Sequence, residues 1–199
     1  FSMNKTEEFK GISELIDLYR EMDEMIEAFI DDTGIVCPPS CGTCCATSTK
    51  NIEVSVFEVM PLALDLWDRD EAEAVLDLLA GSADDGCCVF YRAEIPEGMP
   101  GHCSVHDLRP LVCRLFGYCT RYDKYGRLQN CLCPKMTSTR PGAAGEIMHL
   151  PVMTEFAIRA ASLNPGYGAA RIPLNSALLE ALSIVGMKRS YCSGSDFGG

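Results

Sequence analysis

Hydrophobic positions near both ends of the chain recur at spacings of three and four residues, which is typical of amphipathic helices. Residues 5–31 carry such a stripe, with acidic residues between its members: Phe9, Ile12, Ile16, Tyr19, Ile26 and Ile30. Residues 146–163 and 174–188 also read as helices, and Asn164-Pro165-Gly166 separates them. The pattern therefore predicts three helices, one before and two after the middle of the chain.

The segment 51–80 shows a start signal for a fourth helical region. Ser55 and Glu58 have the spacing of a capping box, in which each side chain bonds the backbone N–H of the other residue. Helix is expected over 56–80, with a kink or interruption near Pro61, since proline lacks the N–H that a helix interior uses. The stretch Glu71–Ala80 is the strongest helix sequence within it.

Residues 87–142 are rich in Cys, Gly, Pro and Arg and show little periodicity. We expect irregular backbone here, with one short helix near 107–116 that carries Pro110 in its first turn, and a turn at 122–126 between short extended segments. The predicted fold is mostly α with irregular cysteine-rich loops, and its helices pack around a metal-binding centre. We expect a single domain over 4–192, with a cysteine-cluster core over 35–136 and a disordered tail at 193–199.

Composition narrows the function classes. The net charge of −11 argues against nucleic acid as a partner. No apolar run is long enough for a membrane span or resembles a signal peptide, so we expect no membrane association and a cytoplasmic location. Hydrophobic residues make up 47% of the chain, so a core can form without covalent crosslinks.

Twelve cysteines dominate the chemistry of the chain. Thiols stay reduced in the cytosol, so metal ligation is favoured over disulfides, although a disulfide-bearing protein is an alternative.

Four of the cysteines lie within nine residues, at Cys37, Cys41, Cys44 and Cys45. A loop with this spacing can present several thiols to one tetrahedral metal, and Gly42 is expected to supply the backbone freedom. The side chains of the adjacent Cys44 and Cys45 are expected to diverge and to serve different metals or different corners of a cluster.

The downstream cysteines form a second pattern. Cys88 precedes an aromatic pair, Cys103 precedes Arg109-Pro110-Leu-Val-Cys113-Arg114-Leu-Phe116, and Cys133 precedes Pro134. Together with the CGTCC segment at 41–45, this order resembles the YkgJ-type cysteine-cluster family (CxxCxxCC), a zinc- or iron-chelating domain, over about residues 35–136. One departure is visible, because many relatives have two residues between the first two cysteines and this chain has three.

The resemblance implies a set of metal ligands: Cys37, Cys41, Cys44, Cys45, Cys88, Cys103, Cys113 and Cys133. Cys131 is an alternative to Cys133, Cys119 falls outside the shared pattern, and Cys87 and Cys192 are interpreted as ordinary thiols. Eight thiols suit two four-ligand centres, or one cluster with a spare set. The nearly pure sulfur ligand pool favours an iron–sulfur cluster of the 4Fe–4S type, and zinc is the alternative.

Two functional hypotheses follow. The first is a metal-binding protein that acts in redox or electron transfer, or as part of a cluster-dependent enzyme; no catalytic residue can be named. The second is a zinc-stabilised structural module that binds a protein partner and has no catalytic role. Arg109 and Arg114 flank Cys113, and either they tune the centre or they pair with a carboxylate such as Asp107. His102 and His106 bracket Cys103 and are expected to lie beside the ligands or on the surface.

Overall fold

A computed structural model describes residues 9–38, 41–81, 86–93, 101–138 and 150–194. The helices in these residues are α1 Ile12–Thr33, α2 Val56–Asp68, α3 Ala72–Ala80, α4 Leu111–Leu115, α5 Met153–Leu163, α6 Pro165–Gly168 and α7 Leu174–Gly194, with 3-10 turns η2 Thr49–Asn51 and η3 His106–Leu108. The strands are β1 Ile35–Val36, β2 Glu53–Val54, β3 Tyr91–Arg92, β4 His102–Cys103, β5 Tyr118–Tyr122, β6 Leu128–Leu132, β7 Thr137–Ser138 and β8 Ile172–Pro173. The mostly α fold with cysteine-rich loops is therefore confirmed.

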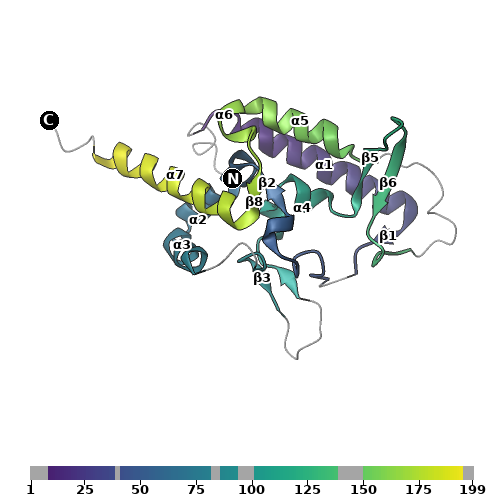
Figure 1. Cartoon of the computed structure of the whole chain (residues 1–199), viewed down its shortest axis with the longest axis horizontal. Coiled ribbons are helices and arrows are strands. Elements are labelled where there is room, and N and C mark those ends of the chain that lie inside the picture. Colours follow the sequence, from purple (N-terminus) through teal and green to yellow (C-terminus); the bar gives the residue numbers. More distant parts are fainter. Residues whose placement is uncertain (1–8, 39–40, 82–85, 94–100, 139–149, 195–199) are drawn as a thin grey trace.

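Helix α1 begins later than the sequence pattern predicts. Residues 5–8 lie outside the described residues, and the helix starts at Ile12, after Gly11 has adopted a left-handed backbone conformation. Gly34 ends the helix in the same conformation and donates its N–H to the carbonyl of Ile30. Ile12 and Tyr19 of the predicted stripe are buried, whereas Ile16, Ile26 and Ile30 are half-buried. Figure 1 shows α1 and α5 side by side along the molecule.

Helix α2 begins at the predicted capping box. The hydroxyl of Ser55 accepts from the N–H of Glu58, and the Glu58 carboxylate accepts from the N–H of Ser55. Of the kink or interruption expected near Pro61, the interruption is wrong, because the helix continues through Pro61 to Asp68. All nine residues from Val56 to Leu64 are buried, so tertiary packing outweighs the hydrogen bond that proline cannot donate. The break comes instead at 69–71, before α3.

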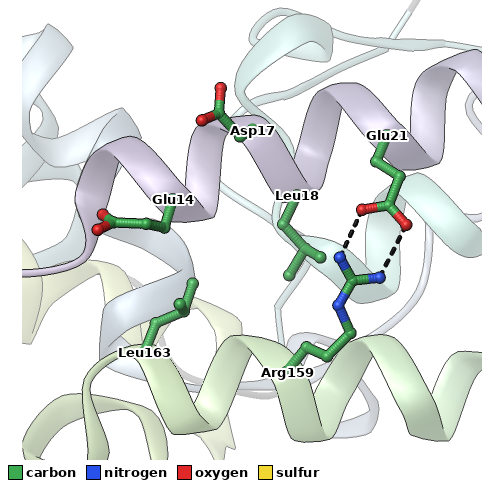
Figure 2. A pocket seen from close by; sticks show the side chains of 6 residues that line it. All are labelled: Glu14, Asp17, Leu18, Glu21, Arg159 and Leu163. Carbon is green, nitrogen blue, oxygen red and sulfur yellow. Dashed lines mark hydrogen bonds and ion pairs between the residues drawn. The ribbon is translucent and has the colours of Figure 1, made fainter.

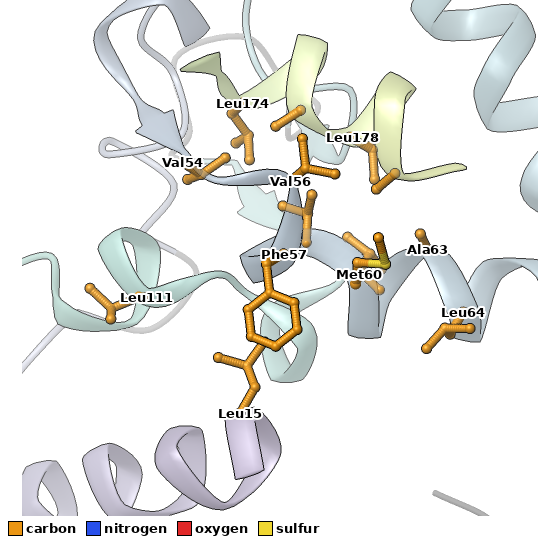
Figure 3. Close-up of a cluster of buried hydrophobic side chains, with 14 of the residues drawn as sticks. Leu15, Val54, Val56, Phe57, Met60, Ala63, Leu64, Leu111, Leu174 and Leu178 are labelled. Atoms are coloured by element: carbon orange, nitrogen blue, oxygen red, sulfur yellow. The ribbon is translucent and has the colours of Figure 1, made fainter. Parts of the chain in front are cut away.

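The core lies between α1, α2 and α7. Figure 3 shows Phe57 of α2 pointing toward Leu15 of α1, while Val56 faces the start of α7 near Leu174 and Leu178. Further along, the indole N–H of Trp67 donates to the carbonyl of Leu182 at 2.9 Å. Apart from this hydrogen bond the contacts are apolar; Cys119 belongs to the core, whereas Cys88, Cys113 and Cys131 are partly buried at its border. A metal centre between the helices therefore stays a prediction.

The helices after residue 150 largely follow the sequence pattern. Met153 is the first residue of α5, whereas residues 146–149 lie outside the described part. The Asn164-Pro-Gly segment forms the short helix α6, and α7 runs on to Gly194 and extends away from the rest of the molecule (Figure 1). Residues 195–199 of the expected tail lie outside the described residues. Among the described helices, none combines the length and the apolar composition that a bilayer-spanning segment needs.

The strands form four short antiparallel pairs. Two of them, β1 with β7 and β2 with β8, connect distant segments, and the other two, β3 with β4 and β5 with β6, join consecutive strands. The β5–β6 hairpin turns at 123–127, in agreement with the turn predicted near 122–126. The helix expected near 107–116 is divided into η3 and α4, and Pro110 is the N-cap of α4 rather than a first-turn residue. Cysteines or their neighbours lie on β1, β4, β5 and β6.

Candidate metal centre

The first cysteine loop packs directly on the β3–β4 hairpin. A Cβ atom added to Gly42 would lie 2.1 Å from the carbonyl oxygen of Gly101, and a Cβ on Gly101 would lie 2.1 Å from the carbonyl oxygen of Arg92. No side chain fits at either position. Gly42 has no left-handed conformation, so the reason for glycine is this close approach and not the backbone freedom that the sequence predicted. The contact brings Cys44 and Cys45 next to Cys103 on β4.

The thiols of Cys44, Cys45 and Cys103 form one contacting group. The Sγ atoms of Cys44 and Cys45 are 3.9 Å apart, so these neighbouring side chains do not diverge as predicted. Hydrogen bonds with Cys103 and with Cys44 raise the pKa of Cys45. The hydrogen bond with Cys45 lowers the pKa of Cys44 and of Cys103, and the positive charge of Arg109 lowers both further. The group therefore favours thiolate at Cys44 and Cys103.

Cys88 and Cys113 adjoin this group from two further segments. The carbonyl of Cys88 accepts from the N–H of Tyr91, which fixes Cys88 at the start of the β3–β4 hairpin. Cys113 lies in the middle of α4. Burial raises the pKa of Cys88 to about 11 and that of Cys113 to about 12, and the negative charge of Cys103 acts on both in the same direction. Cys88 and Cys113 are thus close enough to Cys103 for its charge to affect their pKa values.

The other three predicted ligands lie near one another beside β5. The N–H of Cys37 donates to the hydroxyl of Tyr118 at 2.8 Å. Burial raises the pKa of Cys37 to about 11, with further contributions from Cys41, Cys44 and Cys133. Cys133 packs closely against Gly117, because a Cβ added to Gly117 would lie 2.8 Å from the Cβ of Cys133. The negative charge of Cys44 acts to raise the pKa of Cys41, so Cys44 lies near this second group as well as near the first.

Cys119 and Cys131 form a separate pair. They lie directly opposite each other in the β5–β6 ladder. Burial, together with the neighbouring Cys131, raises the pKa of Cys119 to about 12. Cys133 contributes to the pKa of Cys37, whereas Cys131 faces Cys119. The placement therefore favours Cys133 over Cys131 as the partner of the first loop.

The remaining thiols and histidines show no role in these groups. Cys87 is exposed, and the side chain of Cys192 lies outside the described part. His102 and His106 are both exposed, as expected of residues beside the ligands, and His106 lies 3.6 Å from the carboxylate of Asp107. None of the eleven described cysteines forms a disulfide.

The two arginines beside Cys113 have different surroundings. Arg114 is 5% exposed, forms an ion pair with Asp23 of α1 and lies 4.6 Å above the ring of Tyr19. It also donates to the backbone carbonyl of Asp107, so its role is structural, although its carboxylate partner is Asp23 and not Asp107. Arg109 donates to the carbonyls of His106 and Cys113 and forms no carboxylate ion pair among the described residues.

Sequence reasoning missed two residues that shape this region. The first cysteine loop packs on the backbone of Gly101. In the sequence, the one feature that could have indicated this contact is the position of Gly101 immediately before His102-Cys103. Tyr118 holds the backbone at Cys37 across 81 residues of sequence, and no local pattern indicates that contact. Within the described ranges, no three Cys, His, Asp or Glu side chains are already arranged as a metal site, so the contacting thiols do not surround a common point.

A cavity lies apart from the cysteines, between α1 and α5. It has a volume of about 250 Å³ and is lined by Glu14, Asp17, Leu18, Glu21, Arg159 and Leu163. Figure 2 shows the Glu21–Arg159 ion pair beside it. The hydrogen bond from Arg159 lowers the pKa of Glu21. The cavity contains none of the predicted ligands.

Comparison with known proteins gives one match. The family model CxxCxxCC, described as "Putative zinc- or iron-chelating domain", matches residues 36–134. The chain therefore carries a domain of this family, and the resemblance in its cysteine pattern is confirmed. No curated protein and no solved structure shows significant similarity to the chain. The matched range contains all eight predicted ligands.

Proposed function

We propose that this protein binds metal through two neighbouring four-thiolate sets. One set comprises Cys45, Cys88, Cys103 and Cys113. The other set comprises Cys37, Cys41, Cys44 and Cys133. The observation that carries the proposal is the contact between Gly42 and Gly101, because it joins the two cysteine-rich segments at their thiols.

The surroundings of Cys44 and Cys45 support the division into two sets. Cys45 contacts Cys103, whose charge also acts on Cys88 and Cys113. The negative charge of Cys44 acts to raise the pKa of Cys37 and of Cys41. The charge of Cys133 also acts to raise the pKa of Cys37. Assigning one member of the adjacent pair to each set avoids two ligands from neighbouring residues on one ion.

The donor chemistry fits both metals named in the family description. Thiolates are soft ligands that suit zinc and iron–sulfur clusters, and no carboxylate or imidazole enters either proposed set. We propose a 4Fe–4S cluster as the first candidate, because iron–sulfur clusters are usually held by four cysteines. Such a cluster would supply redox chemistry, and the protein would act in electron transfer or as part of a cluster-dependent enzyme.

A zinc-stabilised module is the second candidate, and the form of the cysteine region favours it. Residues 101–138 contain only short strands, the 3-10 turn η3 and the five-residue helix α4, and two-residue strand pairs join the cysteine segments to one another. A closed four-thiolate zinc site contributes folding free energy to such a region. In this case the metal would be structural, and the function would be to bind a protein partner.

Elemental analysis of protein purified without oxygen tests the proposal. Iron with inorganic sulfide, together with an absorption shoulder near 400 nm, would support the cluster. Zinc in colourless protein would support the structural module. Protein that contains neither element, and that takes up neither zinc nor reconstituted iron and sulfide, would contradict metal binding altogether.

A further inference from the structure

The backbone segment that carries Cys88 is bonded by side chains from two other parts of the chain. The carbonyl of Gly86, at its start, accepts from the N–H of Thr49 at 2.9 Å and from the Thr49 hydroxyl at 3.3 Å. Asn175, the second residue of α7, bonds the backbone on either side of Cys88. The segment is therefore attached to η2, which follows the first cysteine loop, and to α7.

The side chain of Asn175 makes a two-point contact around Cys88. Its amide N–H donates to the carbonyl of Cys87 at 3.2 Å, and its Oδ1 accepts from the N–H of Val89 at 3.3 Å. Asn175 is 3% exposed, and a buried amide is costly unless both its donor and its acceptor are bonded. The backbone around Cys88 supplies both kinds of partner.

The start of α7 is fixed independently of the cysteines. The N–H of Leu174 donates to the carbonyl of Ile52 at 2.9 Å, and the preceding strand β8 pairs with β2. Further along the helix, Leu178 and Leu182 are buried in the core. Asn175 therefore extends from an element that the core already holds in place, as a group that positions a ligand should.

The contact lies where two neighbouring thiols differ. Cys87 is exposed, whereas Cys88 is partly buried and packs against the core. The carbonyl of Cys88 accepts from the N–H of Tyr91 at 2.9 Å, which joins it to the hairpin that carries Cys103. A metal ligand has to lie within about 0.2 Å of its bonding distance, so the backbone on both sides of the ligand must be held.

We propose that Asn175 positions Cys88 for metal binding: by bonding the peptide groups of Cys87 and Val89, it fixes which of two adjacent thiols enters the centre. This inference rests on the proposed function, in which Cys88 is a ligand. Asn175 lies outside residues 36–134, which match the family model. Helix α7 thus gives the centre a contact that the matched range does not contain.

The test measures two properties: Zn²⁺ affinity, by competition with a chromophoric chelator, and the position of iodoacetamide labelling in Zn²⁺-loaded protein, by tandem mass spectrometry. Asn175→Leu removes both hydrogen bonds at similar side-chain size. Val185→Ala, a change at a buried position later in α7, is the control for loosened helix packing. We expect Asn175→Leu to bind Zn²⁺ about 10- to 100-fold more weakly than the wild type, the range seen when groups behind metal ligands are removed.

The labelling should separate positioning from general stability. In the wild type and in Val185→Ala, iodoacetamide should label Cys87 and leave Cys88 unlabelled, whereas in Asn175→Leu it should label both. Unchanged affinity in Asn175→Leu, or a Cys88 that stays unlabelled there, would overturn the inference. Equal losses of affinity in Asn175→Leu and Val185→Ala would assign Asn175 a purely structural role and overturn it as well.

Two further results keep the test decisive. If Asn175→Leu does not fold, as judged by far-ultraviolet circular dichroism, Asn175→Ala also removes both bonds and replaces it under the same criteria. Labelling of Cys88 in the Zn²⁺-loaded wild type would overturn the inference and leave the other thiolate set in place. A wild type that takes up neither Zn²⁺ nor reconstituted iron and sulfide would instead contradict the proposed function itself.

Discussion

At the scale of single residues, the cysteines divide by their neighbours rather than by their spacing. Cys87 and Cys88 are adjacent in sequence, yet Cys87 is exposed, whereas Cys88 lies at the border of the core beside Cys103 and Cys113. A thiol that contacts other thiols can complete a metal site, and an exposed one beside it cannot replace it without moving the backbone. This difference gives a matched pair for testing the ligand assignment.

We therefore expect Cys113→Ser to lower the metal content per chain, whereas Cys87→Ser leaves it unchanged. A serine hydroxyl is a much poorer ligand than thiolate for soft metals, so the set that contains Cys113 should lose its metal. Cys44→Ser should remove metal from the other set. The measurement is elemental analysis of the purified variants. Full metal content in both Cys113→Ser and Cys44→Ser would contradict the two sets.

Gly42 provides a second prediction at this scale. Gly42→Ala places a Cβ 2.1 Å from the carbonyl oxygen of Gly101, so the first cysteine loop must move away from the β3–β4 hairpin. We expect this variant to lose most of its metal because Cys45 no longer reaches Cys103. Gly81→Ala is the control, since its nearest neighbouring atom is 3.9 Å away. Metal content equal to the wild type in Gly42→Ala would show that the loop contact is not required.

The sequence predicts which residues carry the chemistry, but not how they come together. The family pattern selects the eight cysteines, and the spacing of Cys41, Cys44 and Cys45 indicates a tight loop. The docking of that loop depends on Gly101 and Tyr118, which are 59 and 81 residues away from their contacts. Arg114 likewise pairs with an acid 91 residues earlier. Such long-range contacts leave no periodic signal in the sequence.

At the scale of elements, the reliable signals are those with a local physical cause. The capping box at Ser55 and the apolar stripe of α1 were predicted, because helix starts and buried faces depend on residues three and four positions apart. The interruption predicted at Pro61 was wrong, because burial of α2 on several sides outweighs one missing hydrogen bond. Local propensity therefore located α2 correctly but misjudged where it ends.

The capping box should contribute measurably to stability. The Ser55 hydroxyl bonds both the N–H and the carboxylate of Glu58, and that carboxylate also accepts from Arg171 at 2.8 Å. We expect Ser55→Ala to lower the free energy of unfolding by about 1 kcal/mol, the typical cost of losing an N-cap. The exposed Ser183→Ala change on α7 should cost less than about 0.5 kcal/mol. Urea unfolding of metal-free protein measures both, and equal stability of the two variants would contradict the assignment.

At the scale of the whole molecule, the fold combines two differently stabilised parts. Helices α1, α2 and α7 share a continuous apolar core that includes Leu15, Phe57 and Leu182. The cysteine segments are connected to one another by two-residue strand pairs and by thiol contacts. The helical part can therefore fold through burial of apolar surface. The cysteine region places Phe90, Leu111 and Leu115 in the same core, and under the proposed function bound metal would link its cysteine segments to one another.

This division predicts how the protein responds to metal removal. A chelator should loosen the loop at 41–45 and the segment 101–138, because metal–thiolate bonds are the strongest links between them, while α2 and α7 remain folded on their own core. Hydrogen exchange with and without the chelator measures this: amides at Tyr91 and Cys103 in the β3–β4 hairpin should lose protection, and those at Leu64 and Leu182 should keep it. A complete loss of helical circular dichroism on metal removal would show instead that the helices need the metal to fold. In that case the cysteine centre, and not the apolar core, would be the foundation of the whole structure.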